Sequence, residues 1–108
     1  MITGIIARGF ALTTALRAFV ERRLGAALRR HAVAAHRVSA RLADVNGPRG
    51  GIDKSCVIEV RGPALQPVVV RERDADLYAA IDRAAARLDR TLARRVGRRR
   101  RARRADLP

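Results

Sequence analysis

The spacing of apolar residues changes twice along the chain, and these changes limit the folds that it can adopt. Apolar side chains recur every three or four positions over 12–28, alternate over 36–73, and return to the helical spacing over 77–96. A short β-branched stretch at 2–8 comes first. A period near 3.6 indicates an amphipathic helix, whereas a period of two indicates a strand with one buried face. The chain is therefore predicted to fold in the order β-α-β-β-β-α.

The first predicted helix carries a start signal and a single apolar stripe. The Thr13 hydroxyl is placed to cap the helix N-terminus. The stripe consists of Leu12, Leu16, Phe19, Val20, Leu24, Ala27 and Leu28. Arg22 and Arg29 lie on the side away from it. Arg23 falls within the apolar arc, so we expect its stem to be partly covered while its guanidinium reaches solvent.

Each of the three strands predicted between the helices has one apolar face. These faces consist of Val38, Ala40 and Leu42, then Cys56, Ile58 and Val60, and then Val68 and Val70. Turn-forming residues at 46–51 and at Gly62-Pro63 separate the strands, and the last strand is expected to end at about Arg73. Four strands and two helices, each apolar on one side, fit a two-layer α+β sandwich, a four-stranded sheet with both helices on one face.

The last predicted helix has the most informative pattern in the chain. Asp74, Asp76 and Asp82 are assigned to capping and to the favourable interaction with the dipole at its start. Its apolar face consists of Leu77, Ile81, Leu88, Leu92 and Val96. Its opposite face carries Arg83, Arg87, Arg90 and Arg94, within about 60° of each other and along roughly 16 Å. We call these four residues the arginine row; Asp89 lies beside it, but the sequence places no carboxylate within it.

The charge of the chain favours a polyanionic partner. There are 24 Lys and Arg residues against 10 Asp and Glu, a net charge of +14, and eleven of the basic residues lie at or after Arg83. Such a protein collects polyanions at physiological salt. Nucleic acid is the leading candidate. An anionic membrane is a weaker one, because both helices need their apolar faces for the core. With 3% aromatic residues, an aromatic platform for base stacking is disfavoured.

The two ends of the chain have distinctive compositions. The run of arginines at 98–104 is self-repelling, so we expect an α+β domain at 1–97 followed by a disordered Arg-rich tail at 98–108. Residues 1–20 are basic, Thr-containing and free of acid, which is also the pattern of an organellar transit peptide. The same stretch fits the first strand and helix, and we expect neither a signal peptide nor a membrane span.

No set of residues in the sequence suggests catalysis, a metal site or a cofactor site. Cys56 is the only cysteine and is expected to be a small buried core residue, while His31 and His36 have no nucleophile placed beside them. Tyr78 is expected to pack against the core, with a contact to phosphate or base as the alternative. The arginine row itself is either a solvated face or, as its unmixed charge favours, a phosphate-binding face.

The loop at 47–55 ends in Lys54-Ser55 and at first looks like a phosphate-binding loop. It departs from that motif, because Asp53 stands where a glycine is required and a strand follows where a helix is needed. A nucleotide or other small-molecule substrate is therefore not expected. Lys54 remains a candidate contact to a polyanion, and we count it among the RNA-binding residues with Arg22, Arg23, Arg29 and the arginine row.

Two stretches resemble the bacterial and plastid family of ribosome-associated translation inhibitors and hibernation-promoting factors. They are Arg8-Gly9-Phe10-Ala11-Leu12-Thr13-Thr14-Ala15-Leu16-Arg17 and Asp74-Ala75-Asp76-Leu77-Tyr78-Ala79-Ala80-Ile81-Asp82. The resemblance extends over about residues 2–97. It implies the β-α-β-β-β-α sandwich, similar to double-stranded RNA-binding domains, and a non-enzymatic factor in the bacterial cytoplasm. Such a factor binds the small ribosomal subunit and its ribosomal RNA, and inhibits translation or stabilises idle ribosomes under stress or in stationary phase.

The resemblance also implies roles for particular residues. Arg87, Arg90 and Arg94 fall where family members place basic residues against ribosomal RNA, as does Arg23 on the first helix. The sequence looks like the short form of the family, without a C-terminal dimerisation domain, so we expect a monomer off the ribosome. The alternative is a general module for structured RNA with the same fold and no ribosome specificity.

Overall fold

The computed structural model describes residues 4–45, 52–63 and 65–105, with the backbone alone for 99–105. Its elements are β1 (Gly4–Arg8), α1 (Thr14–Arg30), β2 (Arg37–Asp44), β3 (Lys54–Gly62), β4 (Leu65–Asp74) and α2 (Leu77–Ala105). The predicted order β-α-β-β-β-α is confirmed. The turn expected at 46–51 lies outside the described residues.

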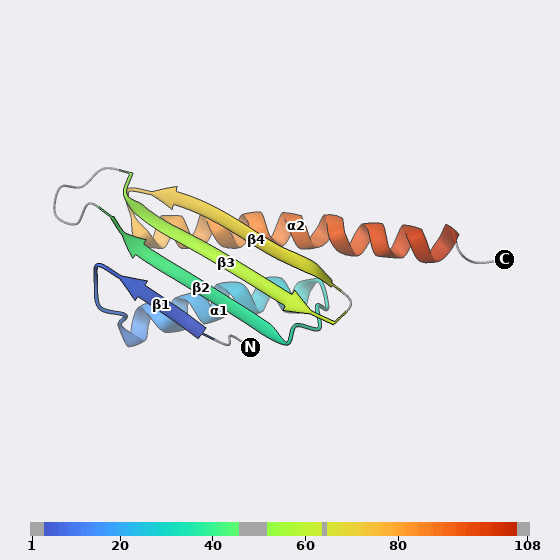
Figure 1. Ribbon diagram of the computed structural model, residues 1–108, viewed down its shortest axis with the longest axis horizontal. Coiled ribbons are helices and arrows are strands. Elements are labelled where there is room, and N and C mark those ends of the chain that lie inside the picture. Colours follow the sequence, from blue (N-terminus) through green and yellow to red (C-terminus); the bar gives the residue numbers. More distant parts are fainter. Residues whose placement is uncertain (1–3, 46–51, 64, 106–108) are drawn as a thin grey trace.

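The four strands form one mixed sheet, in the order β1-β2-β3-β4. β1 pairs with β2 in parallel, and the other neighbours are antiparallel. The parallel pair needs a crossover, which α1 supplies. Both helices cover the same face of the sheet, so the predicted two-layer α+β sandwich is confirmed (Figure 1).

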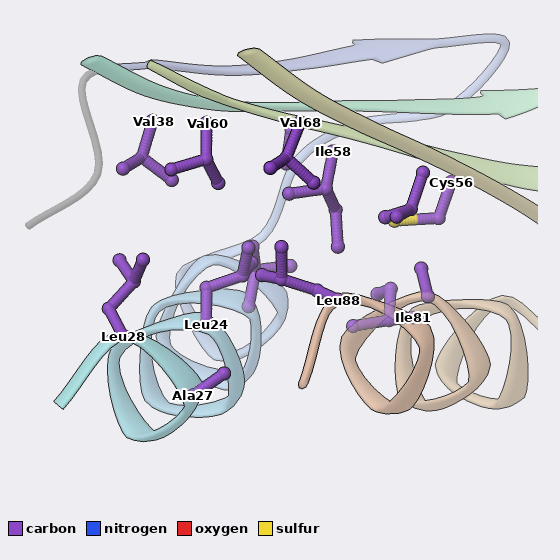
Figure 2. Packing of buried hydrophobic residues seen from close by; sticks show 14 of the residues in the cluster. Leu24, Ala27, Leu28, Val38, Cys56, Ile58, Val60, Val68, Ile81 and Leu88 are labelled. Atoms are coloured by element: carbon purple, nitrogen blue, oxygen red, sulfur yellow. The ribbon is translucent and has the colours of Figure 1, made fainter. Parts of the chain in front are cut away.

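The core lies between the sheet and the helix layer. Figure 2 shows Val38, Ile58 and Val60 pointing from the strands toward Leu24 of α1 and Leu88 of α2. All the apolar strand positions predicted for β2, β3 and β4 are buried. Leu12, which precedes α1, is only partly buried and packs against the cluster from its edge, as do Phe19 and Leu77 of the helices. Neither α1 nor α2 covers the other face of the sheet, whose side chains are exposed or partly exposed along the described strands (Figure 1).

Both helices begin at the capping residues that the sequence indicates. The Thr13 hydroxyl accepts a hydrogen bond from the Leu16 N–H at 3.1 Å, so α1 begins at Thr14 rather than at Leu12. An Asp76 carboxylate oxygen accepts from the Tyr78 N–H at 3.1 Å, and Asp74 accepts from the Asp76 N–H at 3.0 Å. These side chains satisfy backbone donors that the first helical turn leaves unpaired.

Two elements are longer than predicted. β4 begins at Leu65, three residues before Val68, because an edge strand accommodates Pro67 without losing a sheet hydrogen bond. α2 continues to Ala105, through the residues expected to form a disordered tail. Arg and Ala are among the strongest helix formers, and this propensity favours helix despite the charge repulsion. Figure 1 shows the second half of α2 projecting past the end of the strands.

Candidate nucleic-acid interface

All four members of the arginine row are exposed, as their spacing on α2 predicts. Ile81, Leu88 and Leu92 hold the opposite side of the helix in the core, each with 0% exposure. Burial of this apolar side fixes the rotation of α2 about its axis. The guanidinium groups therefore lie along one side of a rigid helix rather than on a mobile loop.

The sheet brings one carboxylate to the row, which the sequence did not indicate. Glu72 of β4 lies 3.7 Å from an Arg83 guanidinium nitrogen and 3.4 Å from one of Arg87. The two arginine side chains keep 60% and 55% of their surface exposed. Ion pairs this exposed contribute little, so both guanidinium groups remain available to an anion. Arg90 and Arg94 have no carboxylate partner within the described residues.

The helices α1 and α2 run in parallel with a constant register. The Phe19 and Tyr78 rings meet edge to face at 4.9 Å, and Arg23 Nε lies 2.7 Å from Asp82 Oδ1. The two residues of each pair are 59 positions apart in the sequence, as are Arg30 and Asp89, which also form an ion pair. We call this line of contacts the helix seam. It confirms the packing role of Tyr78, although 43% of this residue remains exposed.

Two aspartates of the seam differ from the sequence interpretation. The sequence predicts a capping role for Asp82, but this residue lies in the second turn of α2, where it contacts Arg23. The guanidinium of Arg23 reaches the surface as predicted, with 43% of the side chain exposed, and there it is paired. Asp89 accepts from Arg30 and lies 2.9 Å from His31 Nε2. Burial raises the pKa of Asp89, but the contacts with His31 and Arg30 outweigh burial and hold that pKa below its ordinary value.

The outer side of the helix layer joins the predicted arginines of both helices. Arg22 and Arg29 of α1 are exposed on the side opposite its buried Leu24. They face away from the sheet, whereas Arg83 and Arg87 of the arginine row lie beside Glu72 at the β4 edge of the sheet. We call Arg22, Arg29 and the arginine row together the helix-layer basic face; Arg23 lies at its centre, in the seam.

Lys54 is the one predicted RNA-binding residue that lies on a strand and not on the helix layer. Its ammonium lies 3.0 Å from Asp53 and 3.2 Å from Asp44, and its side chain is only 20% exposed. The hydrogen bond to Asp53 raises the pKa of Lys54, burial opposes this, and Asp44 adds to the increase. Lys54 points to the helix side of the sheet, where it neutralises the fully buried Asp53. It is therefore not part of the helix-layer basic face.

The structure also places the groups that could serve in catalysis or metal binding. Cys56 is buried as predicted, and this burial raises the pKa of its thiol to about 12, so it stays protonated at neutral pH. Within the described residues, no three His, Cys, Asp or Glu side chains come together as metal ligands would. Neither helix, over its described length, is both long and apolar enough to cross a membrane.

Comparison with protein families shows to which family this chain belongs. Residues 4–100 match the model of the family described as sigma 54 modulation protein / S30EA ribosomal protein. The chain belongs to this family. The predicted resemblance is thereby confirmed, because this is a family of non-enzymatic, ribosome-associated factors that act in hibernation and translation inhibition.

Two solved structures have the same architecture as this chain. The N-terminal domain of Protein Y from Thermus thermophilus is 33% identical, covers 86% of this chain and 96% of its own, and superposes with a TM-score of 0.66. A ribosomal subunit interface protein from Coxiella burnetii is 17% identical over 85% of this chain and 96% of its own, with a TM-score of 0.64. At that identity the second likeness shows the fold alone. The comparison with curated proteins found no match.

Proposed function

We propose that this protein binds the small ribosomal subunit through its ribosomal RNA and inhibits translation by occupying the site. The observation that carries the proposal is the helix-layer basic face, six exposed arginines on two helices of fixed register, in a chain that belongs to a ribosome-associated family. Guanidinium groups bind phosphate through a planar fork of donors. Such contacts position a protein on RNA without any chemical step.

The residues of the face have distinct parts in this proposal. The arginine row contacts successive phosphates along about 16 Å, and Arg22 and Arg29 contact a neighbouring segment of the RNA backbone. When RNA binds, Arg23 gives up its exposed ion pair with Asp82 and contacts a phosphate instead. This costs little free energy, because exposed ion pairs are weak. Lys54 has a smaller part, because two carboxylates already hold its ammonium. We propose a monomer in the bacterial cytoplasm, bound to ribosomes, with no cofactor.

Co-sedimentation of the purified protein with ribosomes and with separated subunits tests this function. We expect saturable binding to the small subunit, competition by messenger RNA and initiator transfer RNA, and inhibition of a bacterial translation extract at near-stoichiometric amounts. Undiminished translation on ribosomes saturated with the protein would contradict the proposal. Equal affinity for an unrelated RNA duplex of similar length would indicate a general module for structured RNA instead.

A further inference from the structure

The face of the sheet turned away from the helices carries a second group of arginines. Alternation along the strands places Arg8 of β1, Arg41 of β2 and Arg71 of β4 on this side, opposite the buried Leu42 and its neighbours. The pairing register puts Ile6, Arg41, Val57 and Arg71 in one row across all four strands, and Arg8, Ala43, Ser55 and Arg73 in the next. Figure 1 looks onto this open face, with both helices behind the strands.

The open face is strongly basic in its own right. The charged residues that the described strands place on it are Arg8, Arg37, Arg41, Arg61, Arg71, Arg73 and Glu59, and all six arginines are exposed. Glu59 pairs with Arg61 at 2.6 Å. Five positive charges therefore remain on the face. They lie on the opposite layer of the molecule from the arginine row, so one duplex segment cannot contact both.

The arginines surround a hollow with an apolar floor. It is lined by Ile6, Arg8, Arg41, Leu42, Ala43, Ser55, Val57 and Arg71. The small side chains of Ala43 and Ser55 leave space between the longer arginines, while Ile6 is 57% exposed at the rim. Ser55 supplies a hydroxyl beside the guanidinium groups. A site with basic walls, one neutral donor and an apolar floor suits a ligand that is anionic on one side and apolar on the other.

We propose that this open face binds an unpaired RNA strand. Its phosphates would contact Arg8, Arg41 and Arg71, and a base would lie on Ile6 and Val57 or against a guanidinium plane. No aromatic residue lies on this face among the described strands, so the affinity depends mainly on charge and falls with salt. A membrane surface fits less well, because the described strands place only two large exposed apolar side chains on this face, Ile6 and Val69. The proposal goes beyond the proposed function, which uses the helix layer.

Matched double variants separate the two faces. We compare Arg41→Gln/Arg71→Gln with Arg22→Gln/Arg29→Gln, which removes the same charge from the helix layer. The probe is a labelled oligouridylate of about ten nucleotides, within the usual site size of single-strand binders. We expect the open-face variant to lose about five-fold or more in affinity and roughly 1.4 in logarithmic salt slope, as for two lost phosphate contacts. The helix-layer variant should lose clearly less affinity for the oligouridylate than the open-face variant.

Two further measurements make the result specific. Glu59→Gln removes the carboxylate from the face and should strengthen oligouridylate binding about two-fold or more. Amide chemical shifts on adding the oligonucleotide should change at Ile6, Ala43, Ser55 and Val57. Thermal melting checks that every variant folds.

Several outcomes would overturn the proposal. They are equal losses for the two double variants, shift changes confined to α2, and binding of polyglutamate or of anionic vesicles as tight as that of the oligonucleotide.

Small-subunit binding, measured in parallel, should change by less than about three-fold for the open-face variant. Absence of small-subunit binding by the parent protein would count against the proposed function and leave the oligonucleotide result to be judged separately.

Discussion

Asp89 is the residue whose contacts fasten the C-terminal end of α1 to α2. It accepts from Arg30, and His31 Nε2 lies 2.9 Å away. His31 is also the C-cap residue of α1, and its N–H donates to the Ala27 carbonyl. A single carboxylate thus connects the last turn of one helix with the middle of the other. Its loss should loosen the seam without touching the apolar core.

We predict that Asp89→Asn destabilises the fold at neutral pH by about 1 kcal/mol, the scale of partly exposed ion pairs. The pKa of Asp89 is lower in the folded than in the unfolded state, so its stabilisation is complete above the unfolded pKa and is lost as pH falls through the folded pKa. The difference between variant and parent should therefore disappear below about pH 3. Urea denaturation at pH 7 and at low pH measures it.

Glu21→Gln serves as the control for that prediction. Glu21 is exposed on α1 and has no ion pair within the part of the chain that the structure describes. It should alter stability by less than about 0.5 kcal/mol at either pH. A loss at Glu21 equal to that at Asp89 would mean that net charge, rather than the seam contact, determines the effect.

α2 combines two functions on its two sides. Its buried side supplies Ile81, Leu88 and Leu92 to the core, and its exposed side carries the arginine row. Because the helix is held by the buried side, the exposed side can be changed without altering the packing. This separation makes the helix suitable for a test of binding alone.

We predict that Arg83→Gln/Arg87→Gln/Arg90→Gln/Arg94→Gln folds normally, because Gln is a good helix former and the apolar side is unchanged. Its affinity for the small subunit should fall at least about ten-fold at physiological salt, and each lost phosphate contact should reduce the logarithmic salt slope by about 0.7–0.9. Sedimentation at several salt concentrations measures both quantities.

Changing Arg61 and Arg71 on the sheet should matter less for the small subunit. If the quadruple variant folds and binds as well as its parent, the arginine row is a solvated face. The contact surface would then lie on α1, the loop at 46–51 or the C-terminal end. Circular dichroism of the quadruple variant confirms that any loss of binding does not come from unfolding.

At the scale of the whole molecule, the sandwich exposes two basic surfaces on opposite layers, and α2 extends past both. The buried residues of α2 end at Leu92, and Val96 is only partly buried. Among the side chains that the structure describes, the contribution of α2 to the core therefore ends at Leu92, while the sequence beyond Val96 adds mainly charge. The boundary at 97/98 remains a prediction, although the backbone there is helical to Ala105.

We predict that removing residues 98–108 leaves the fold intact and weakens RNA binding. The deletion takes away six arginines and one aspartate, so the net charge falls from +14 to +9. Both the affinity for the small subunit and its salt slope should decrease. The melting temperature should change by less than about 4 °C, the shift expected for a loss near 1 kcal/mol. A larger loss of thermal stability would show that the domain extends beyond residue 97.

The order of the elements, the apolar face of each strand, the cap at Thr13 and the common side of the arginine row can all be predicted from the sequence. These features depend on periodicity and on neighbours within about four positions, which a single chain displays directly. The resemblance in two stretches was enough to indicate the family. α2 extends beyond the predicted boundary at residue 97, because the helix propensity of Arg and Ala outweighs the repulsion among the arginines.

Which charged residues contact one another depends on the tertiary packing. Glu72 beside Arg83 and Arg87, the pair of Arg23 with Asp82, and the burial of Lys54 against Asp53 all join residues through packing or register. The open face likewise gathers arginines from strands that are far apart in the sequence. The pattern of side chains along an element predicts the face on which each residue lies. Which residue of the next element it contacts depends on how whole elements pack, and this cannot be read from neighbouring positions in the sequence.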